Sequence, residues 1–191
     1  MKDPGKPPTR RVFIGIRVPA DLAGLLADFG RANFLHAPGV RWSDPNDLHI
    51  TLKFLGGVQA AVLEDVRNRL AEIRMRPFKV SLTGAGFFEA AGILFAEVLR
   101  TAELHSLQES VERSMIGSGF ARDERPYRPH ITVARRIGKR RIAMPHALVT
   151  RLDGFCKGVP GRSFTAQRII LYESVAGHYQ ALQEYDLWSP H

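Results

Sequence analysis

The chain has 191 residues, a hydrophobic content of 45% and a formal net charge of +8 at pH 7. That hydrophobic content supports a folded core, and no apolar run approaches the ~20 residues of a membrane span, so neither disorder nor membrane insertion is expected. The single cysteine, Cys156, excludes an intramolecular disulfide and fits a reducing cytoplasm, where we expect the protein. The positive charge favours a polyanionic partner, although a basic surface without such a partner is about as common.

The N-terminal third of the chain alternates apolar strand patterns with one helical pattern. Residues 1–10 are basic and proline-rich with no apolar segment behind them, which predicts a flexible arm rather than a secretory signal. The elements expected after it are a strand (11–18), a helix (19–33), a short strand (40–42), a turn (44–47) and a strand (48–56). The last of these contains the tripeptide His-Ile-Thr.

The rest of the chain continues the mixture of helices and strands. The expected elements are a helix (58–75), two strands (78–89, 93–100), a helix (101–118), a strand (125–135), a helix (144–152) and two closing strands (163–174, 178–188). A strand with His-Ile-Thr, a helix and two strands thus occur twice, over 49–100 and 130–188. This order predicts an α+β fold with two similar lobes and mostly antiparallel strands, in one domain over residues 11–191.

The repeated tripeptide is the strongest functional signal. His-Ile-Thr occurs at residues 49–51 and again at 130–132. In a strand, alternate side chains share a face, so each copy places an imidazole and a hydroxyl on one face and isoleucine on the other. Two such strands facing one site suit phosphodiester chemistry. One histidine can take a proton from water while the other gives one to a leaving oxygen, and the threonines can stabilise charge on phosphate.

Other residues around the two copies fit the same chemistry. Basic residues gather near the second copy, from Arg122 to Arg141, and the cations Lys53, Arg128 and Arg135 are placed to attract a phosphate.

Two other kinds of site were weighed. A zinc site is disfavoured because no His-Glu-x-x-His or cysteine pair accompanies either copy, and a serine triad lacks its Gly-x-Ser-x-Gly turn. A single histidine on an apolar strand is more often a hydrogen-bonded structural residue. Packing does not demand the same order twice, however, so the pair favours acid–base catalysis without a metal or another cofactor.

Longer stretches around these motifs carry a resemblance to a known family. RVFIGIRVP, VRWSDPNDLHITLKFLGGV, RPYRPHITVAR and IILYES, together with the strand at 179–187, span nearly the whole chain beyond the arm. The chain resembles the two-histidine phosphoesterase superfamily, and more closely the RNA 2′,3′-cyclic phosphodiesterases, also described as 2′-5′ RNA ligases. The resemblance implies two α+β lobes related by a pseudo-twofold, each with helices outside a mostly antiparallel sheet, around a central groove.

The same resemblance implies a reaction and a role for each motif residue. The reaction opens an RNA 2′,3′-cyclic phosphate end to a 2′-phosphomonoester. His49 is the implied proton donor and His130 the implied proton acceptor, with Thr51, Thr132 and Arg135 on the phosphate. Phe13 or Tyr127 is a candidate for stacking on a terminal base, with core packing as the alternative role of Phe13.

Three alternatives to this reaction remain open at the level of sequence. The same site could join RNA ends through a 2′-5′ bond or act on a small cyclic nucleotide, and a module that binds RNA without catalysis would also explain the charge. Both half-sites lie in one chain, which predicts a monomer.

Overall fold

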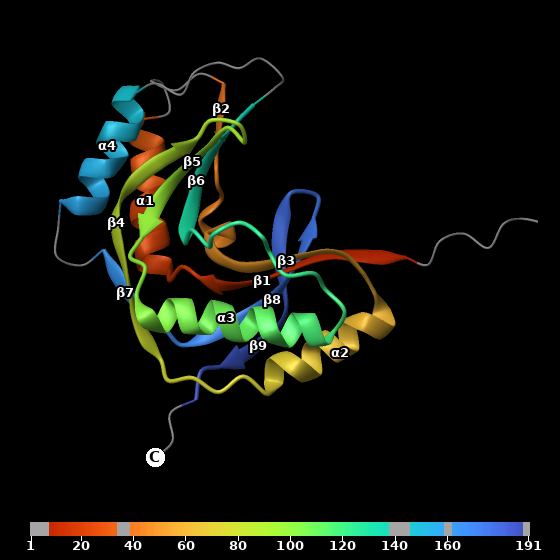
Figure 1. The fold of residues 1–191 in the computed structure, drawn as a ribbon. Helices are drawn as coiled ribbons and strands as arrows, with labels where there is room; N and C mark the ends of the chain where they lie inside the picture. Colours follow the sequence, from red (N-terminus) through yellow and green to blue (C-terminus); the bar gives the residue numbers. More distant parts are fainter. Residues whose placement is uncertain (1–7, 34–38, 138–145, 159–161, 189–191) are drawn as a thin grey trace, which may run out of the picture.

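The chain folds around one curled antiparallel sheet, described by a computed structural model for residues 8–33, 39–137, 146–158 and 162–188 (Figure 1). Most of the expected arm and the basic residues 139–141 lie outside this description. The strands are β1 (Thr9–Arg17), β2 (Val40–Trp42), β3 (His49–Gln59), β4 (Phe78–Phe88), β5 (Ile93–Val98), β6 (His130–Arg136), β7 (Ser163–Ala166), β8 (Arg168–Val175) and β9 (His178–Asp186). The helices are α1 (Ala20–Asn33), α2 (Ala60–Ala71), α3 (Ala102–Gly117) and α4 (His146–Lys157), with a short 3-10 helix η2 (Pro45–Asp47). The predicted α+β fold class is confirmed.

The two halves of the sheet meet where the two His-Ile-Thr strands pair. The strand order is β7-β4-β5-β6-β3-β1-β8-β9, with β2 attached to β6. The hairpin that follows the first motif strand, β4–β5, pairs with β6, while the hairpin that follows the second, β8–β9, pairs with β1. Each half therefore takes strands from both copies of the sequence repeat. This exchange brings the two motifs to the centre of the sheet.

The helices pack on the two halves in pairs. Figure 1 shows α2 and α3 below the β3–β1–β8 half, and α1 and α4 beside the β4–β5–β6 half. Phe29 of α1 contacts Phe155 of α4 with ring centroids 5.4 Å apart. The main core lies between the helices and the sheet and includes Ile50 and Ile131, both fully buried. The isoleucines of the two motifs therefore anchor their strands on the helix side.

Several boundaries differ from the sequence prediction; among them, β6 begins at His130 instead of residue 125, and α2 ends at Ala71 instead of residue 75. The strand expected over 163–174 is two strands, because β7 pairs with β4 and β8 pairs with β1. Strand β1 begins at Thr9, inside the expected arm, because its first residues pair with the end of β3. Helix α4 continues to Lys157, beyond the expected end at residue 152, with Cys156 buried in its last turn.

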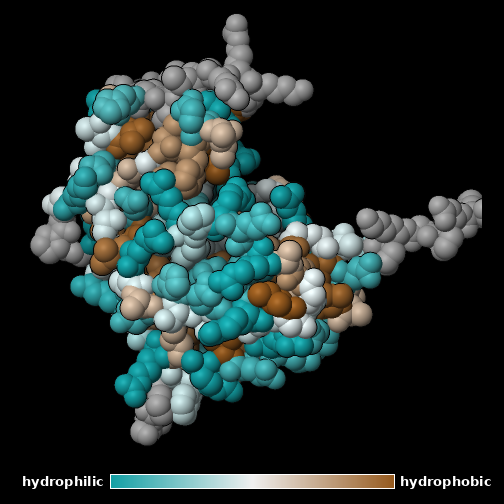
Figure 2. Space-filling model, in the orientation of Figure 1, coloured by the Kyte–Doolittle hydropathy of each residue, from teal (hydrophilic) through white to brown (hydrophobic). Residues whose placement is uncertain are grey.

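The outer surface is mainly polar. Figure 2 shows one face of the molecule, on which hydrophilic residues surround separate hydrophobic patches. No helix within the described ranges is both long and apolar enough to cross a membrane.

Candidate functional site

The two His-Ile-Thr tripeptides lie side by side on adjacent antiparallel strands. Ile50 of β3 is directly opposite Ile131 of β6. Continuing this antiparallel register places His49 opposite Thr132 and Thr51 opposite His130, because residues step in opposite directions along the two strands. The pair is thus symmetric about an axis between the isoleucines. We call the sheet surface that carries the two imidazoles and two hydroxyls the motif face.

Both imidazoles are held by the same local hydrogen bond. Nδ1 of His49 donates to the carbonyl of Asp47 over 2.7 Å, and Nδ1 of His130 donates to the carbonyl of Arg128 over 2.7 Å. A carbonyl only accepts, so Nδ1 must carry hydrogen in both rings. The second nitrogen, Nε2, then has its lone pair available in the neutral ring and a proton to donate in the charged ring. The two rings are therefore prepared alike for proton transfer through Nε2.

Burial favours the neutral form of both histidines in the free protein. It lowers the pKa of His49 to about 4, opposed by the hydrogen bond to Asp47 and reinforced by the positive charges of Arg135 and His130. Burial also lowers the pKa of His130, with the guanidinium groups of Arg128 and Arg135 acting in the same direction. Arg135 thus acts electrostatically on both rings. An anion bound among these groups would offset their positive charges, raise the pKa of both histidines and so favour their protonation.

An aromatic cluster surrounds His49. The ring of Phe13 lies 4.7 Å from the imidazole and stacks on Tyr172 at 4.9 Å, while Tyr179 meets the imidazole edge-on at 4.9 Å. Phe13 is only 2% exposed. Both of its faces are engaged within the protein, so Phe13 orients His49 and does not present an open face to an RNA base.

Sequence reasoning missed Phe54, which is the exposed member of this cluster. Its side chain is 65% exposed, and its ring lies 5.6 Å from that of Phe13. The pairing of β1 with β3 shifts between Ile14 and Gly15, so that Leu52 is an extra residue on β3. Such a bulge reverses the alternation of side chains beyond it. Phe54 consequently lies beside the His49 cluster instead of on the helix side.

The same bulge removes Lys53 from the site, contrary to the expectation from sequence. Its ammonium is buried at 3% exposure, pairs with Glu112 of α3 over 2.8 Å and donates to the carbonyl of Ala121 over 3.0 Å. Glu112 is itself 1% exposed. Lys53 therefore ties the motif strand to α3 and is not available to a phosphate.

A matching bulge in β6 brings Arg135 toward the histidines. The pairing of β5 with β6 shifts between Leu94 and Phe95, which leaves Val133 as the extra residue. The alternation beyond Val133 is reversed, so Arg135 joins the motif face although it lies an odd number of positions after His130. Phe54 and Arg135 hold equivalent positions, each five residues after its histidine.

The two remaining candidates, Arg128 and Tyr127, are separated although they are adjacent in sequence. The Arg128 guanidinium lies over the rings of Phe88 and Phe95, at 5.2 and 5.0 Å, and both rings also contact His130. Tyr127 packs against the main core, and burial raises the pKa of its phenol well above the ordinary value. The structure brings Arg128 to the site and directs Tyr127 away from it.

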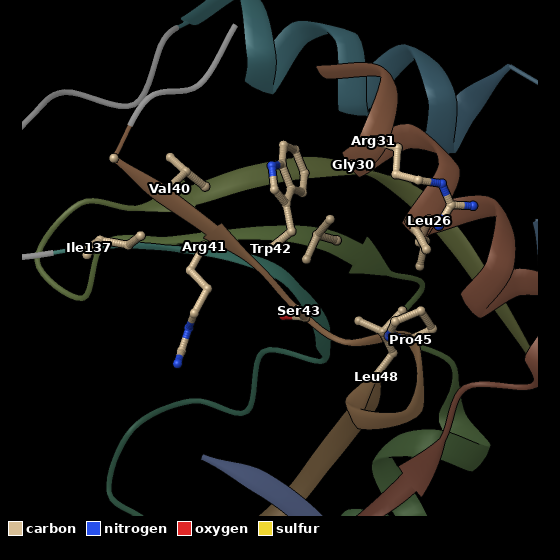
Figure 3. Close-up of a pocket in the computed structure, with 13 residues that line it drawn as sticks. Leu26, Gly30, Arg31, Val40, Arg41, Trp42, Ser43, Pro45, Leu48 and Ile137 are labelled. Carbon is tan, nitrogen blue, oxygen red and sulfur yellow. The ribbon is translucent and has the colours of Figure 1, made fainter. Parts of the chain in front are cut away.

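A cavity of about 920 Å³ lies between α1 and β2 (Figure 3). Its described lining is largely apolar and includes Leu26, Val40, Trp42 and Leu48. None of the four motif side chains is among these residues. The lining also includes the polar side chains of Arg31, Arg41 and Ser43.

The chain is similar to proteins whose names describe phosphodiester chemistry. A family model described as the 2′-5′ RNA ligase superfamily matches residues 30–178. A Bacillus subtilis protein named RNA 2′,3′-cyclic phosphodiesterase is 30% identical over 170 residues, which cover 84% of this chain and 86% of the relative. A Geobacillus stearothermophilus protein of the same name is 28% identical, with 85% of this chain aligned to 51% of the relative. An Archaeoglobus fulgidus protein of that name is 38% identical over 51% of this chain and 56% of the relative. The chain thus matches only about half the length of the last two relatives.

Solved structures share the fold. The crystal structure of E. coli LigT complexed with 3′-AMP superimposes with a TM-score of 0.76 at 24% identity, covering 95% of this chain and 99% of that one. A crystal structure from Thermus thermophilus, of the protein TT0787, gives a TM-score of 0.72 at 22% identity, covering 95% and 100%. At this level of identity the comparison concerns the architecture alone.

Proposed function

Because the chain belongs to the 2′-5′ RNA ligase superfamily, we propose that it hydrolyses RNA 2′,3′-cyclic phosphate ends to 2′-phosphomonoesters. The names of the relatives give the substrate class. The observation that carries the proposal is the pairing of Ile50 with Ile131, which puts two imidazoles and two hydroxyls on one face in a symmetric arrangement. We assign residues 11–191 to one bilobal domain behind the N-terminal arm.

The proposed reaction includes two proton transfers, one on each side of the phosphorus atom. Water attacks phosphorus and loses a proton to Nε2 of His130, while the bond from phosphorus to the 3′ oxygen breaks. Nε2 of His49 gives its proton to that leaving oxygen. One oxygen–phosphorus bond forms and one breaks, and the imidazole pair ends with its protonation states exchanged.

The remaining residues of the motif face stabilise charge on the phosphate. Thr51 and Thr132 lie opposite the partner histidines in the extended register, where their hydroxyls can donate to the two non-bridging oxygens. Arg135 supplies a positive charge that reaches both rings. Arg128 is exposed beside His130, where it can meet the next phosphate of the RNA. These roles need no metal ion.

The exposed ring of Phe54 is our candidate for stacking on the base next to the cyclic phosphate. Bases stack on aromatic side chains in most single-stranded RNA sites. Both motifs come from one chain, so a monomer holds the whole site, and we place the protein in the cytoplasm.

The test is phosphorus NMR of an oligoribonucleotide ending in a 2′,3′-cyclic phosphate, incubated with the protein in EDTA. We expect conversion to a 2′-phosphate by the wild type and its loss in His49→Ala and His130→Ala. His105→Ala, which removes an exposed histidine of α3, is the matched control and should retain activity. Binding of the RNA without conversion would exclude the hydrolase and favour a binding module. Conversion only of a small cyclic nucleotide would change the substrate.

A further inference from the structure

We propose that Asp47 is the positioning residue that makes His49 the proton donor, and that Arg128 is its opposite-charge counterpart for His130. The proposal rests on the proposed function and explains how a nearly symmetric pair of motifs can take two different roles. Asp47 and Arg128 hold equivalent positions, each two residues before its histidine. Each uses its carbonyl to hold Nδ1 of that histidine over 2.7 Å. Their side chains differ in charge.

The carbonyl of Asp47 is fixed by the short helix that precedes the motif strand. Asp47 is the last residue of η2, whose first turn is capped by the Asp44 carboxylate, which accepts from the Asn46 amide over 2.8 Å. The Asp47 amide donates to the Asp44 carbonyl over 2.9 Å. The Leu48 amide also donates to the Pro45 carbonyl. Hydrogen bonds therefore fix the main chain at Asp47 and at the residue after it, and with it the carbonyl that holds the His49 ring.

The carboxylate of Asp47 attaches a second element to the same ring. Its Oδ1 accepts from the Tyr179 amide over 2.8 Å, and its Oδ2 lies 3.0 Å from Nδ1 of His178. Both partners begin β9, directly after a turn in which Ala176 and Gly177 have φ of 50° and 88°. The Tyr179 ring then meets His49 edge-on at 4.9 Å. One residue thus holds the imidazole from its Nδ1 side and clamps the β8–β9 hairpin against its ring.

Arg128 does not form such a clamp. Its guanidinium lies over Phe88 and Phe95, the rings that contact His130, and ends near Glu97 at 3.4 Å. A cation therefore lies beside the proposed proton acceptor, where it favours the neutral ring. An anion that is only 12% exposed lies beside the proposed donor, where it favours the charged ring.

Among the charged groups around His49, Asp47 differs in the direction of its effect on the pKa of the ring. Arg135 and His130 lower the pKa of His49, whereas Asp47 raises it through both its carbonyl and its charge. Around His130, the carbonyl of Arg128 raises the pKa, whereas the charges of the Arg128 and Arg135 guanidinium groups lower it. Burial is the largest effect on each ring, so Asp47 does not make His49 charged in the free protein. It raises the fraction that is charged, and kcat/KM depends on that fraction.

The test compares Asp47→Asn and Asp47→Ala with the wild type, and uses Asp44→Asn as the control. Asparagine at 47 can still accept from the Tyr179 amide but has no charge, whereas alanine also loses the clamp. Asp44→Asn makes the same carboxylate-to-amide change in the same short helix, and asparagine still caps it. Each variant is titrated by NMR of the imidazole carbon-bound protons between pH 2.5 and 8, with His49 assigned from the His49→Ala spectrum. kcat and KM are measured at pH 7.

We expect Asp47→Asn to lower the pKa of His49 and to lower kcat/KM at pH 7 by roughly 2–3-fold, at tenfold per pKa unit, because the variant keeps the carbonyl and loses only the charge. Asp47→Ala should lower kcat/KM further than Asp47→Asn does, and should speed amide exchange at the β8–β9 turn. Asp44→Asn should match the wild type in both readouts. Arg128→Gln should raise the pKa of His130.

The two readouts separate the failure of this inference from failure of the proposed function. An unchanged pKa of His49 in Asp47→Asn overturns the inference, whatever the protein hydrolyses, because the titration needs no substrate. A lowered pKa with unchanged kcat/KM also overturns it, since His49 would then not be the donor. A fall in melting temperature alone, with both readouts unchanged, would mean that Asp47 has only a structural role.

Discussion

The low pKa of His49 predicts an unusual pH dependence for the proposed pair of catalytic histidines. Burial brings this pKa to about 4. At pH 7, roughly one free molecule in a thousand then carries the proton on His49, compared with about a quarter at an ordinary pKa of 6.5. Because kcat/KM reports on the free protein, it should peak below pH 6.5 and fall about tenfold for each pH unit above the peak.

The complex should behave differently from the free protein. A bound phosphate anion faces both Nε2 atoms and favours their protonation, so the peak of kcat should lie at higher pH than that of kcat/KM. The assay is initial hydrolysis rates on an oligoribonucleotide with a cyclic phosphate end, from pH 4 to 9 at constant ionic strength. Arg135→Gln removes a charge that lowers both pKa values, so its kcat/KM peak should move to higher pH. A kcat/KM that is level from pH 5 to 8 would refute this reasoning.

Three further predictions concern stability and substrate binding. Glu112→Ala leaves the buried ammonium of Lys53 unpaired and should lower the free energy of unfolding in urea by about 3–5 kcal/mol, most of which the double variant Lys53→Met, Glu112→Leu should recover. If the double variant lost as much free energy of unfolding as Glu112→Ala, the unpaired ammonium would not be the cause of the loss. Phe54→Ala should raise KM for RNA by roughly 5–150-fold with little change in kcat, as expected for about 1–3 kcal/mol of stacking, and equal KM values would remove Phe54 from the RNA site. The pKa of His49 is lower in the folded than in the unfolded state, so its contribution to stability is present above pH 6.5 and is lost toward pH 4. The loss is at most about 3 kcal/mol, and His49→Gln should show a smaller acid loss in the same urea titrations.

The sequence predicted the elements well where local pattern and tertiary pairing agree. The helix beginning near Ala20 and the hairpin around Gly92 follow directly from periodicity and turn residues. The split near Gln167 could not be read from the sequence, since both sides are equally apolar and only their partners differ. The exchange of hairpins between the halves is likewise a property of long-range pairing. The repeat showed two similar units but not which strands each half contains.

The site was less predictable than the motifs because of the two bulges. Alternation along a strand places His49 with Thr51 and His130 with Thr132, and it fails beyond Leu52 and Val133. A cation near each motif looked equivalent in sequence. The bulges bury one of them, Lys53, and bring the other, Arg135, to the histidines. No local signal marks an extra residue in a strand of this composition, so pairing with the neighbouring strand must be known.

The same geometry makes the two halves of the motif face chemically different. Two bulges at equivalent places present Phe54 after the first histidine and Arg135 after the second, an exposed ring on one half and a cation on the other. The residues two before the histidines, Asp47 and Arg128, add an anion and a cation to the same two halves. In the proposed reaction, a phosphate bound between the imidazoles would have an aromatic half with the proton donor on one side and a cationic half with the proton acceptor on the other. We therefore expect a substrate with a base at one end and phosphates at the other to bind productively in one orientation, with the leaving oxygen on the His49 side.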